Sequence, residues 1–414
     1  MRSYSFFTIL LLCLGILIID ILAFIGLQPI IDYINSATIK STVYIAFWLF
    51  TIGLITAILI LKVRMDAIHP GRKQLLISSL YGLTISSFIP KILFVIVFAI
   101  LYFTNSLAVD TKWFVPIVLL SLFAGLLPFL VIVYAIFKAV YRFKVYKENI
   151  AFENLPKSFS GLKIVQISDV HIGSFNSRYH ILERAVKFIN DLEPDIIFFT
   201  GDMVNNFAWE LKGWATVFKK LKAAQGKFAI LGNHDYGDYS EWNTPKEKKD
   251  NFESIKYFFK KIDFKLLLNS ADIILLNSDK IAIIGVENWG KPPFKQYGDL
   301  EKALKDTKNI SFKILLSHDP SHWTEEVIDK TNIALTLSGH THGMQAGFSL
   351  RNKKWSPIQY KYKHWAGLYK HKNQYLYVNR GLGWLGFPGR IGMRPEITLL
   401  TLNRKQINNP NKQG

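Results

Sequence analysis

Five short motifs between residues 169 and 342 place His, Asp or Asn directly after apolar runs. They are Asp169-Val170-His171, Gly201-Asp202, Gly232-Asn233-His234-Asp235, His318 and Gly339-His340-Thr341-His342. Imidazole, carboxylate and amide groups together suit divalent Mn, Fe, Co or Zn. Any single motif is more often an ordinary turn or a satisfied structural residue. Because five of the ten histidines follow this pattern, the set favours a metal site.

The apolar runs before these motifs have the length and composition of buried β-strands. The runs cover residues 162–168, 195–200, 226–231, 312–317 and 334–338. Segments with helical periodicity alternate with them, so we expect an α/β domain over residues 161–402. Ligands of open α/β sheets bind at the carboxyl ends of strands. The motifs therefore lie where such a domain forms its site.

Taken together and in this order, the five motifs resemble the signature of the calcineurin-like metallophosphoesterases. The contexts Ile-Ser-Asp-Val-His, Thr-Gly-Asp, Leu-Gly-Asn-His-Asp-Tyr and Leu-Ser-His-Asp-Pro are similar to a bacterial, membrane-associated phosphodiesterase branch. That branch usually has a second Gly after Gly-His-Thr-His-Gly, where this chain has Met344. The difference concerns the shape of the pocket and not the metal ligands.

The resemblance implies a sandwich of two β-sheets flanked by helices, with a dinuclear metal site at the strand ends. One metal is expected on Asp169, His171 and His342, the other on Asn233, His318 and His340, with Asp202 bridging them. The implied activity is that of a phosphodiesterase or pyrophosphatase, in which a metal-bridging hydroxide attacks phosphorus in line. A metal-binding scaffold without turnover is the alternative, and loss of ligands would favour it. The motifs retain all of them.

The same resemblance assigns His234 to catalysis and not to metal binding. Its imidazole would stabilise developing charge or protonate the leaving oxygen. We expect Asp235 to orient the His234 ring, as carboxylates do for other catalytic imidazoles. An ordinary turn residue is the alternative for Asp235.

Four apolar segments near the amino terminus are each about long enough to cross a membrane as a helix. They cover residues 5–27, 43–62, 82–104 and 113–137. The third contains Pro90 and Lys91, which are costly in lipid unless they face other helices, and Asp20 could pair with Lys91. We therefore expect an α-helical membrane bundle over residues 1–137. A channel or transporter with an appended regulatory domain is the alternative.

The formal net charge is +19, and basic residues concentrate in two of the segments that flank the apolar runs. These residues are Lys62, Arg64, Arg72 and Lys73 after the second run, and Lys138, Arg142, Lys144 and Lys147 after the fourth. The other two loops carry only Lys40 and Lys112. The positive-inside rule predicts a multi-pass protein of the cytoplasmic membrane with its catalytic domain in the cytoplasm. We expect residues 138–160 to be a basic linker and residues 403–414 a polar tail.

The expected partners are a phosphate-containing small molecule or lipid as substrate, and the membrane lipids themselves. Trp384 could accept an acyl chain while Arg380 or Arg390 contacts a second phosphate, although a place in the domain core is the more ordinary role for Trp384. Residues 348–372 mix aromatic residues with lysines, which next to four spans indicates an interfacial surface rather than an RNA-binding one. Nucleic acid is therefore not expected as a partner. The single cysteine, Cys13, excludes a disulfide framework and a thiolate metal site.

Overall fold

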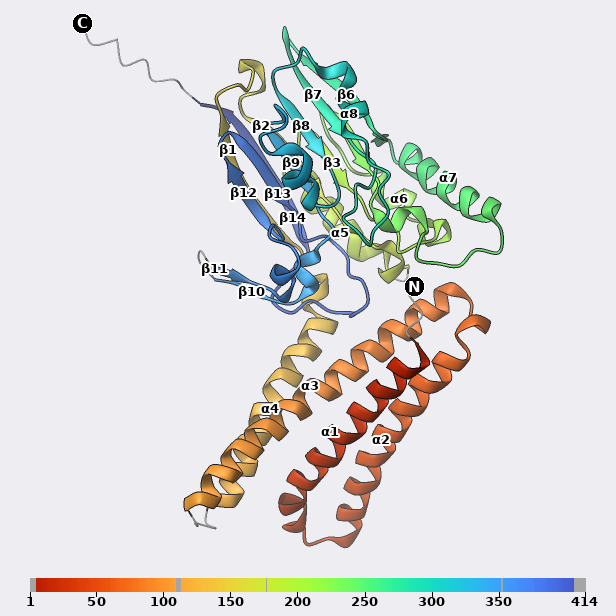
Figure 1. Cartoon of the computed structure of the whole chain (residues 1–414), viewed down its shortest axis with the longest axis vertical. Coiled ribbons are helices and arrows are strands. Elements are labelled where there is room, and N and C mark those ends of the chain that lie inside the picture. Colours follow the sequence, from red (N-terminus) through yellow and green to blue (C-terminus); the bar gives the residue numbers. More distant parts are fainter. Residues whose placement is uncertain (1–4, 109–112, 176, 351–352, 406–414) are drawn as a thin grey trace, which may run out of the picture. The chain divides into compact units, whose positions relative to one another are not determined.

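The computed structural model describes residues 5–108, 113–175, 177–350 and 353–405. The chain divides into two compact units (Figure 1). The first runs to Ala139 and includes Gly386–Gly389, and the second comprises Val140–Leu385 together with the residues from Arg390 onward. The two units are described separately below.

The first unit is built from four long helices. They are α1 (Phe6–Asp32), α2 (Ala37–Val63), α3 (Pro70–Ala108) and α4 (Phe114–Phe137), and a short 3-10 turn, Met65–Ala67, follows α2. By length and composition, each of these helices could cross a membrane. The four predicted segments are thus confirmed as apolar helices. Most of their large apolar side chains point outward, which suits a hydrocarbon environment.

An ion pair lies inside this helical unit. Lys91 of α3 donates to Asp20 of α1 at 2.7 Å, as the sequence suggested, and Asp20 also accepts a hydrogen bond from the hydroxyl of Thr51 in α2. Asp20 is only 1% exposed. Ionised groups within apolar helices are tolerated when they face the bundle interior and are paired. The pair therefore links three of the four helices through a single carboxylate.

The second unit contains two six-stranded mixed sheets. The first has the order β1 (Lys144–Phe152), β14 (Glu396–Arg404), β2 (Leu162–Ile167), β3 (Ile196–Thr200), β4 (Gly226–Ile230) and β5 (Lys265–Leu266). The second has the order β12 (Gly367–His371), β13 (Gln374–Val378), β9 (Leu335–Ser338), β8 (Lys313–Leu316), β7 (Asp279–Gly285) and β6 (Ser270–Leu276). A separate hairpin pairs β10 (Phe348–Leu350) with β11 (Lys353–Trp355). Strands β2, β3 and β4 are parallel, and so are β7, β8 and β9, so each series ends at one edge of its sheet.

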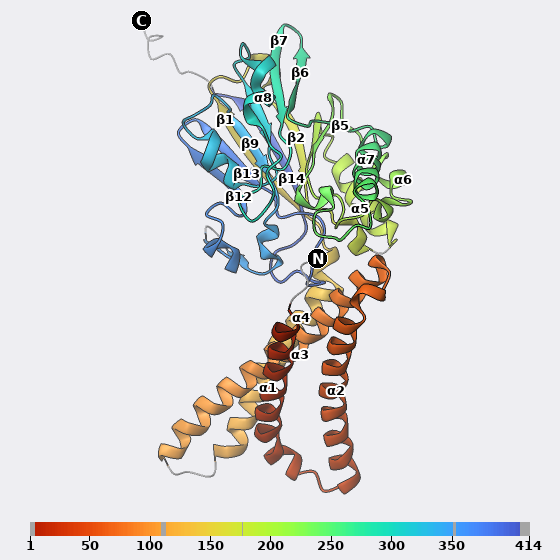
Figure 2. The ribbon, with the colours of Figure 1, turned by 45° about the vertical axis from the view of Figure 1, so that its right-hand side comes forward.

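Alternate side chains of the strands form two different cores. Ile164 and Phe198 of the first sheet pack with residues of the second sheet such as Ile283 and Ile314, so the two sheets face each other. Their neighbours in sequence, which include Val165, point the other way and pack against α5 (Tyr179–Asn190), α6 (Ala215–Phe218) and α7 (Pro245–Lys261). These three helices lie together in Figure 2.

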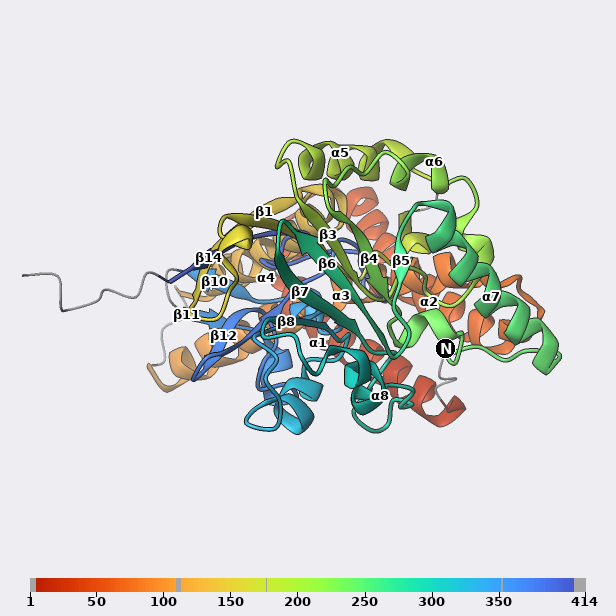
Figure 3. The same cartoon turned by 90° about the horizontal axis from the view of Figure 1, so that it is seen from above.

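The outer face of the second sheet is covered by α8 (Leu300–Leu304) and a π-helical turn, Trp323–Val327. Figure 3 shows α5 and α6 on the opposite side of the sheets from α8. Short 3-10 turns complete the unit at Ala139–Tyr141, Lys157–Phe159, Ile172–Phe175, Ala208–Leu211, Asn233–Tyr236, Lys305–Thr307, His342–Gln345 and Pro357–Tyr360. The expected sandwich of two sheets flanked by helices is confirmed.

The predicted linker over residues 138–160 is wrong for its central part. Residues Lys144–Phe152 form β1, which pairs in parallel with β14 along its whole length, from Lys144 opposite Glu396 to Phe152 opposite Arg404. The basic composition hid this strand because β1 is an edge strand, whose lysines can point to solvent. The α/β unit therefore begins about twenty residues earlier than residue 161, at Val140.

Replacing Lys91 by Met should destabilise the helical unit by about 3 to 5 kcal/mol, because the buried carboxylate of Asp20 would lose its counter-charge. The double variant Asp20→Asn/Lys91→Met should recover most of this loss, since it leaves no charge to desolvate. Denaturation of the purified full chain in detergent micelles measures both changes.

Lys40→Met provides a matched control. It removes the pair with Asp32, whose side chain is 69% exposed, and should cost about 1 kcal/mol or less. Equal losses in the Lys91 single variant and in the double variant would show that the charge pair is not the cause.

Candidate functional site

The side chains predicted to form the site lie on loops that directly follow five strands. Asp169 and His171 follow β2, Asp202 follows β3, and Asn233 and His234 follow β4, all in the first sheet. His318 follows β8, and His340 and His342 follow β9, both in the second sheet. The carboxyl ends of the two parallel series thus bring all of these residues together.

Five of these residues have a left-handed backbone conformation, which residues other than glycine rarely adopt. The φ angles are 48° at Asp169, 45° at His171, 61° at Asp202, 73° at His340 and 51° at His342. Left-handed conformations of this kind cost roughly 1 to 3 kcal/mol each and cluster at functional sites. The domain therefore maintains strain after β2, β3 and β9, where the left-handed backbone sets the direction of these side chains.

Two glycines allow the loops to approach one another. A Cβ atom on Gly339 would lie 2.0 Å from the hydroxyl of Ser168 and 2.2 Å from a carboxylate oxygen of Asp169. A Cβ atom on Gly201 would lie 2.6 Å from Nδ1 of His318. All three distances are far below van der Waals contact, so neither position has room for a side chain. The glycine in each motif is therefore required by the approach of one sheet's loops to those of the other.

Asp169, His171 and His342 form the first group, with one potential ligand atom from each lying within 4.8 Å of the others. The two Nε2 atoms of His171 and His342 are 3.1 Å apart, and Nε2 of His342 is 3.3 Å from Oδ1 of Asp169. Asp169 and His171 are completely buried. This is the set that the sequence predicted for one metal.

Asp202, His318 and His340 form the second group by the same measure. Oδ2 of Asp202 lies 3.2 Å from Nε2 of His318. The amide oxygen of Asn233 lies 2.8 Å from Nδ1 of His340, so Asn233 also faces this group. The predicted members of the second metal site are therefore neighbours in space.

Asp202 is the residue that lies between the two groups. Its Oδ2 atom is 3.2 Å from Nε2 of His318 and 3.6 Å from Nε2 of His171, which belongs to the other group. Its Oδ1 atom accepts a hydrogen bond from the backbone N–H of His234 at 2.9 Å. One carboxylate oxygen is thus within reach of cations held by either group.

The donor atoms of the site fit a metal because their lone pairs face one another. Nδ1 of His318 donates to the carbonyl of Thr200 at 2.7 Å, which leaves Nε2 with a lone pair directed into the site. The described atom that faces this buried Nε2 is Oδ2 of Asp202, at 3.2 Å. Carboxylate oxygens and unprotonated imidazole nitrogens repel one another at such distances unless a cation lies between them.

The electrostatics of the buried groups favour positive charge at this place. Burial alone would raise the pKa of Asp169, but the neighbouring His342 outweighs burial and lowers it to about 2. Burial would lower the pKa of His318, yet Asp202 and Asp169 raise it to about 10. The carboxylates therefore favour a proton on His318, and a bound cation would displace that proton. Burial holds the pKa of His171 well below its ordinary value, which keeps this imidazole neutral and able to coordinate.

His234 lies beside the two groups and belongs to neither of them. The centroid of its ring is 5.0 Å from that of His171 and 4.5 Å from that of Tyr239. Nδ1 of His234 is 2.7 Å from the carbonyl oxygen of Asn205, so this nitrogen carries the proton and donates it. Nε2 is left for contact with a substrate, as the assignment of His234 to catalysis requires.

Asp235 does not orient the His234 ring, so that part of the prediction is wrong. Its carboxylate accepts four backbone N–H groups, from Gly232, Asp202 and Met203 at 2.9 Å each and from Val204 at 3.1 Å. Burial and the charge of Asp202 raise the pKa of Asp235 to about 7, and the N–H groups oppose this rise. Asp235 is thus a structural residue that joins the loops after β3 and β4.

The orientation of His234 depends on two residues that the sequence did not single out. Asn205 supplies the carbonyl that His234 contacts, and Glu210 holds the Asn205 loop by accepting the N–H groups of Asn205, Asn206 and Phe207 at 2.8 to 3.0 Å. Glu210 is only 5% exposed, and burial raises its pKa to about 7. No motif in the sequence around Glu210 marks its role in holding the Asn205 loop.

Tyrosines also reach the site from outside the motifs. The hydroxyl of Tyr362 lies 2.8 Å from Nε2 of His340, and that of Tyr239 accepts from the amide of Asn233 at 2.9 Å. Tyr362 belongs to the aromatic and basic stretch that we expected to be an interfacial surface. Within that stretch Tyr362 and Trp365 are buried, whereas Tyr360 is 81% exposed. The stretch therefore has one face toward the site and another toward its surroundings.

The suggested substrate contacts of Arg390 and Trp384 are wrong. Arg390 is completely buried and donates to the carbonyl oxygens of Gly383, Arg380 and Met393. Arg380 is 5% exposed and pairs with Glu396 at 2.5 Å. Trp384 packs against Phe175 within the core at a centroid distance of 4.6 Å. Nη2 of Arg390 also lies 3.4 Å from Nδ1 of His342, so Arg390 contacts a residue of the first group while Trp384 fills the core.

Residues 162–344 match the family model described as calcineurin-like phosphoesterase. A transmembrane protein with metallophosphoesterase domain from Danio rerio is 29% identical over 282 residues, which are 66% of this chain and 60% of that protein. The uncharacterized metallophosphoesterase YkuE of Bacillus subtilis is 32% identical over 253 residues, which are 60% of this chain and 81% of the relative.

The chain spans less than two thirds of the Danio rerio protein. A solved structure, phosphopantetheinyl hydrolase from Mycobacterium tuberculosis, is similar at a TM-score of 0.28 and 10% identity, over 48% of this chain and 89% of the other. The Bacillus subtilis relative is matched over 81% of its length at 32% identity, and the family model covers all five motifs of the site. The chain belongs to the calcineurin-like metallophosphoesterase family.

Proposed function

We propose that the protein is a membrane-anchored phosphohydrolase with two divalent metal ions, acting as a phosphodiesterase or pyrophosphatase. The observation that carries the proposal is the position of Oδ2 of Asp202, 3.2 Å from Nε2 of His318 in one group and 3.6 Å from Nε2 of His171 in the other. A carboxylate in that position can offset the repulsion between two neighbouring cations.

Seven side chains would hold the metals. Asp169, His171 and His342 would bind one ion, Asn233, His318 and His340 the other, and Asp202 would bind both. Mixed imidazole and oxygen donors suit Mn, Fe, Co or Zn. Two such ions polarise a phosphoryl group and lower the pKa of bound water. Nδ1 of His318 donates to the Thr200 carbonyl, so Nε2 is the nitrogen that would bind a metal once the ion has displaced its proton.

His234 would act on the substrate. Its backbone N–H is held by Asp202 and its Nδ1 by the carbonyl of Asn205, so the ring has a fixed position relative to both groups. Burial lowers the pKa of His234, and the charge of Asp202 partly offsets this. A neutral imidazole with its proton on Nδ1 presents Nε2 as an acceptor, and after taking up a proton it can donate to a leaving oxygen.

The α/β unit would act in the cytoplasm on a phosphate-containing small molecule or lipid. Four apolar helices and relatives named as transmembrane proteins support the membrane location. The basic residues on the segments after α2 and α4 support the orientation. A catalytic unit attached in this way would meet lipid head groups at high local concentration, and basic residues near a bilayer also favour anionic lipids.

Asp202→Asn should abolish both metal binding and turnover, because the amide keeps the volume of the side chain but removes the negative charge between the cations. Elemental analysis and hydrolysis of a panel of phosphomonoesters, phosphodiesters and lipid pyrophosphates with added Mn²⁺ measure the two effects. Asp191→Asn, at an exposed position, is the control and should leave both unchanged. Two bound metals with normal turnover in Asp202→Asn would refute the assignment of Asp202 as the carboxylate that holds both ions. A wild-type protein that binds metal and hydrolyses none of the panel would be a scaffold.

His234→Ala should lower kcat by roughly 10² to 10⁴ while the metal content stays intact, because the imidazole contacts the substrate and does not ligate. The exposed His180 offers the same substitution outside the site, and His180→Ala should behave as the wild type. Loss of metal in His234→Ala would assign this residue to the ligands instead.

A reporter enzyme that is active only outside the cytoplasm, fused to the end of the full chain, should give no signal, because the positive-inside rule predicts a cytoplasmic α/β unit. The reporter follows the whole chain because a fusion shortly after α4 would interrupt β1 and its pairing with β14. A cytoplasm-dependent reporter at the same position should be active. The reverse pair of signals would overturn the orientation.

A further inference from the structure

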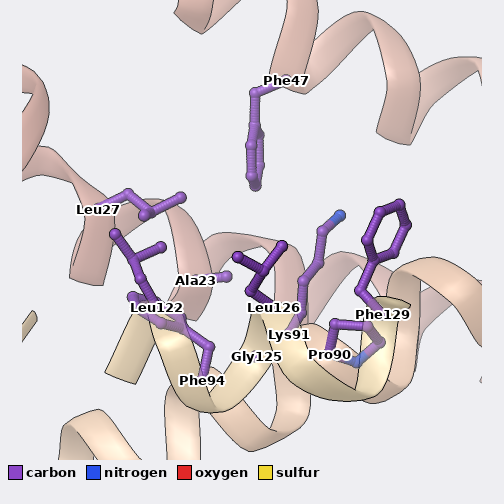
Figure 4. A pocket seen from close by; sticks show the side chains of 10 residues that line it. All are labelled: Ala23, Leu27, Phe47, Pro90, Lys91, Phe94, Leu122, Gly125, Leu126 and Phe129. Carbon is purple, nitrogen blue, oxygen red and sulfur yellow. The ribbon is translucent and has the colours of Figure 1, made fainter. Parts of the chain in front are cut away.

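A pocket of about 240 Å³ lies among the helices of the first unit (Figure 4). Its walls include Ala23 of α1, Phe47 of α2, Lys91 and Phe94 of α3, and Leu126 of α4. By comparison, an engineered apolar cavity of about 150 Å³ remains free of water and takes up benzene. The pocket thus has space for several carbon atoms.

The lining of the pocket favours a neutral, apolar occupant. Lys91 is its only charged residue, and the Lys91 ammonium already contacts the carboxylate of Asp20 at 2.7 Å and the ring of Phe47 at 4.9 Å from its centroid. An anionic ligand at this level would have to compete with Asp20, which is almost completely buried. The remaining lining groups offer dispersion contacts only.

The depth of the pocket indicates hydrocarbon rather than head groups. Asp20 lies near the middle of α1 (Phe6–Asp32), with roughly 18 to 21 Å of helix on either side. If the helices cross a bilayer, whose hydrocarbon core is about 30 Å thick, this level is occupied by acyl chains. Polar head groups lie at the two surfaces and do not reach it.

The pocket is accessible from the outer surface of the helical unit. Leu126 and Phe129, which line it, are 51% and 40% exposed. Their exposed surfaces would face the surrounding lipid, so a chain can enter from the side. An unfilled pocket of this size would forfeit the dispersion contacts of its lining.

We propose that this pocket binds an acyl chain of a bilayer phospholipid, with the neutralised Lys91–Asp20 pair as part of its wall. The inference rests on the membrane location and not on the phosphohydrolase activity. A bound chain would complete the packing between Phe47 on α2 and the α4 side chains across the pocket. All residues that line the pocket belong to the helical unit, and none of them is a predicted metal ligand.

The test uses the full chain in lipid nanodiscs that contain phosphatidylcholine and phosphatidylglycerol with a photoreactive diazirine in mid-chain. After illumination, mass spectrometry locates the labelled residues. We expect labels to concentrate on pocket residues such as Phe94 and Leu126. Equal labelling of Leu49, which is 67% exposed and outside the pocket, would show ordinary contact with the bilayer and overturn the proposal.

Two adjacent leucines of α4 provide a matched pair of variants. Leu126 and Leu127 are 51% and 56% exposed, but only Leu126 lines the pocket. Leu126→Trp should obstruct the pocket and reduce labelling of Phe94 several-fold, whereas Leu127→Trp should leave it unchanged. Equal labelling of Phe94 in both variants would contradict the site. The map of the wild-type protein needs no variant, so the proposal stays testable even if Leu126→Trp folds poorly.

Two further measurements separate the possible explanations. A photoreactive polyisoprenoid that labels the pocket, when phospholipid does not, would overturn the assignment to an acyl chain. Hydrolysis measured on the same nanodiscs is independent of the labelling. Pocket labelling without turnover would leave the lipid site intact and count against the proposed function. Turnover without pocket labelling would support the proposed function and overturn the lipid site.

Discussion

The carboxylate of Asp202 lies between an imidazole of each sheet, and the charge balance around it is the constraint that the site must satisfy. Asp169 and Asp202 are almost completely buried next to His171 and His318, which are completely buried. Burying so many ionisable groups costs several kcal/mol per uncompensated charge. The cost is offset when the groups share protons or bind cations, so the site and the preference for positive charge have the same physical origin.

The two sheets supply the rigidity that this balance requires. Parallel strands end at one edge of each sheet, and the left-handed residues that follow them turn the side chains inward. Asp235 contributes by joining the loops after β3 and β4 through backbone N–H groups. Glu210 and Asn205 fix the ring of His234 in the same way, through backbone groups. Precise positions thus depend on buried carboxylates that hold loops, as well as on the ligands themselves.

Buried charges in the helical unit also need a partner, and there the surroundings are more apolar. Asp20 and Lys91 are acceptable there because they neutralise each other and because Thr51 and Phe47 take up their remaining polar contacts. The side chains around them leave a pocket instead of closing completely. A simple anchor would need neither feature, so the helices have a more specific structure than attachment alone demands.

The sequence by itself determined the four apolar helices, most of the strands and the residues that gather at the site, because these depend on local periodicity and on motifs at strand ends. Tertiary structure alone decided the rest. The strand β1 forms only by pairing with β14, which lies some 250 residues away in the chain. Asp235, Arg390 and Trp384 looked functional next to the motifs, yet packing buries them against backbone groups and core side chains. The contact between Tyr362 and His340 likewise depends on how loops from different strands meet, and local sequence does not encode that approach.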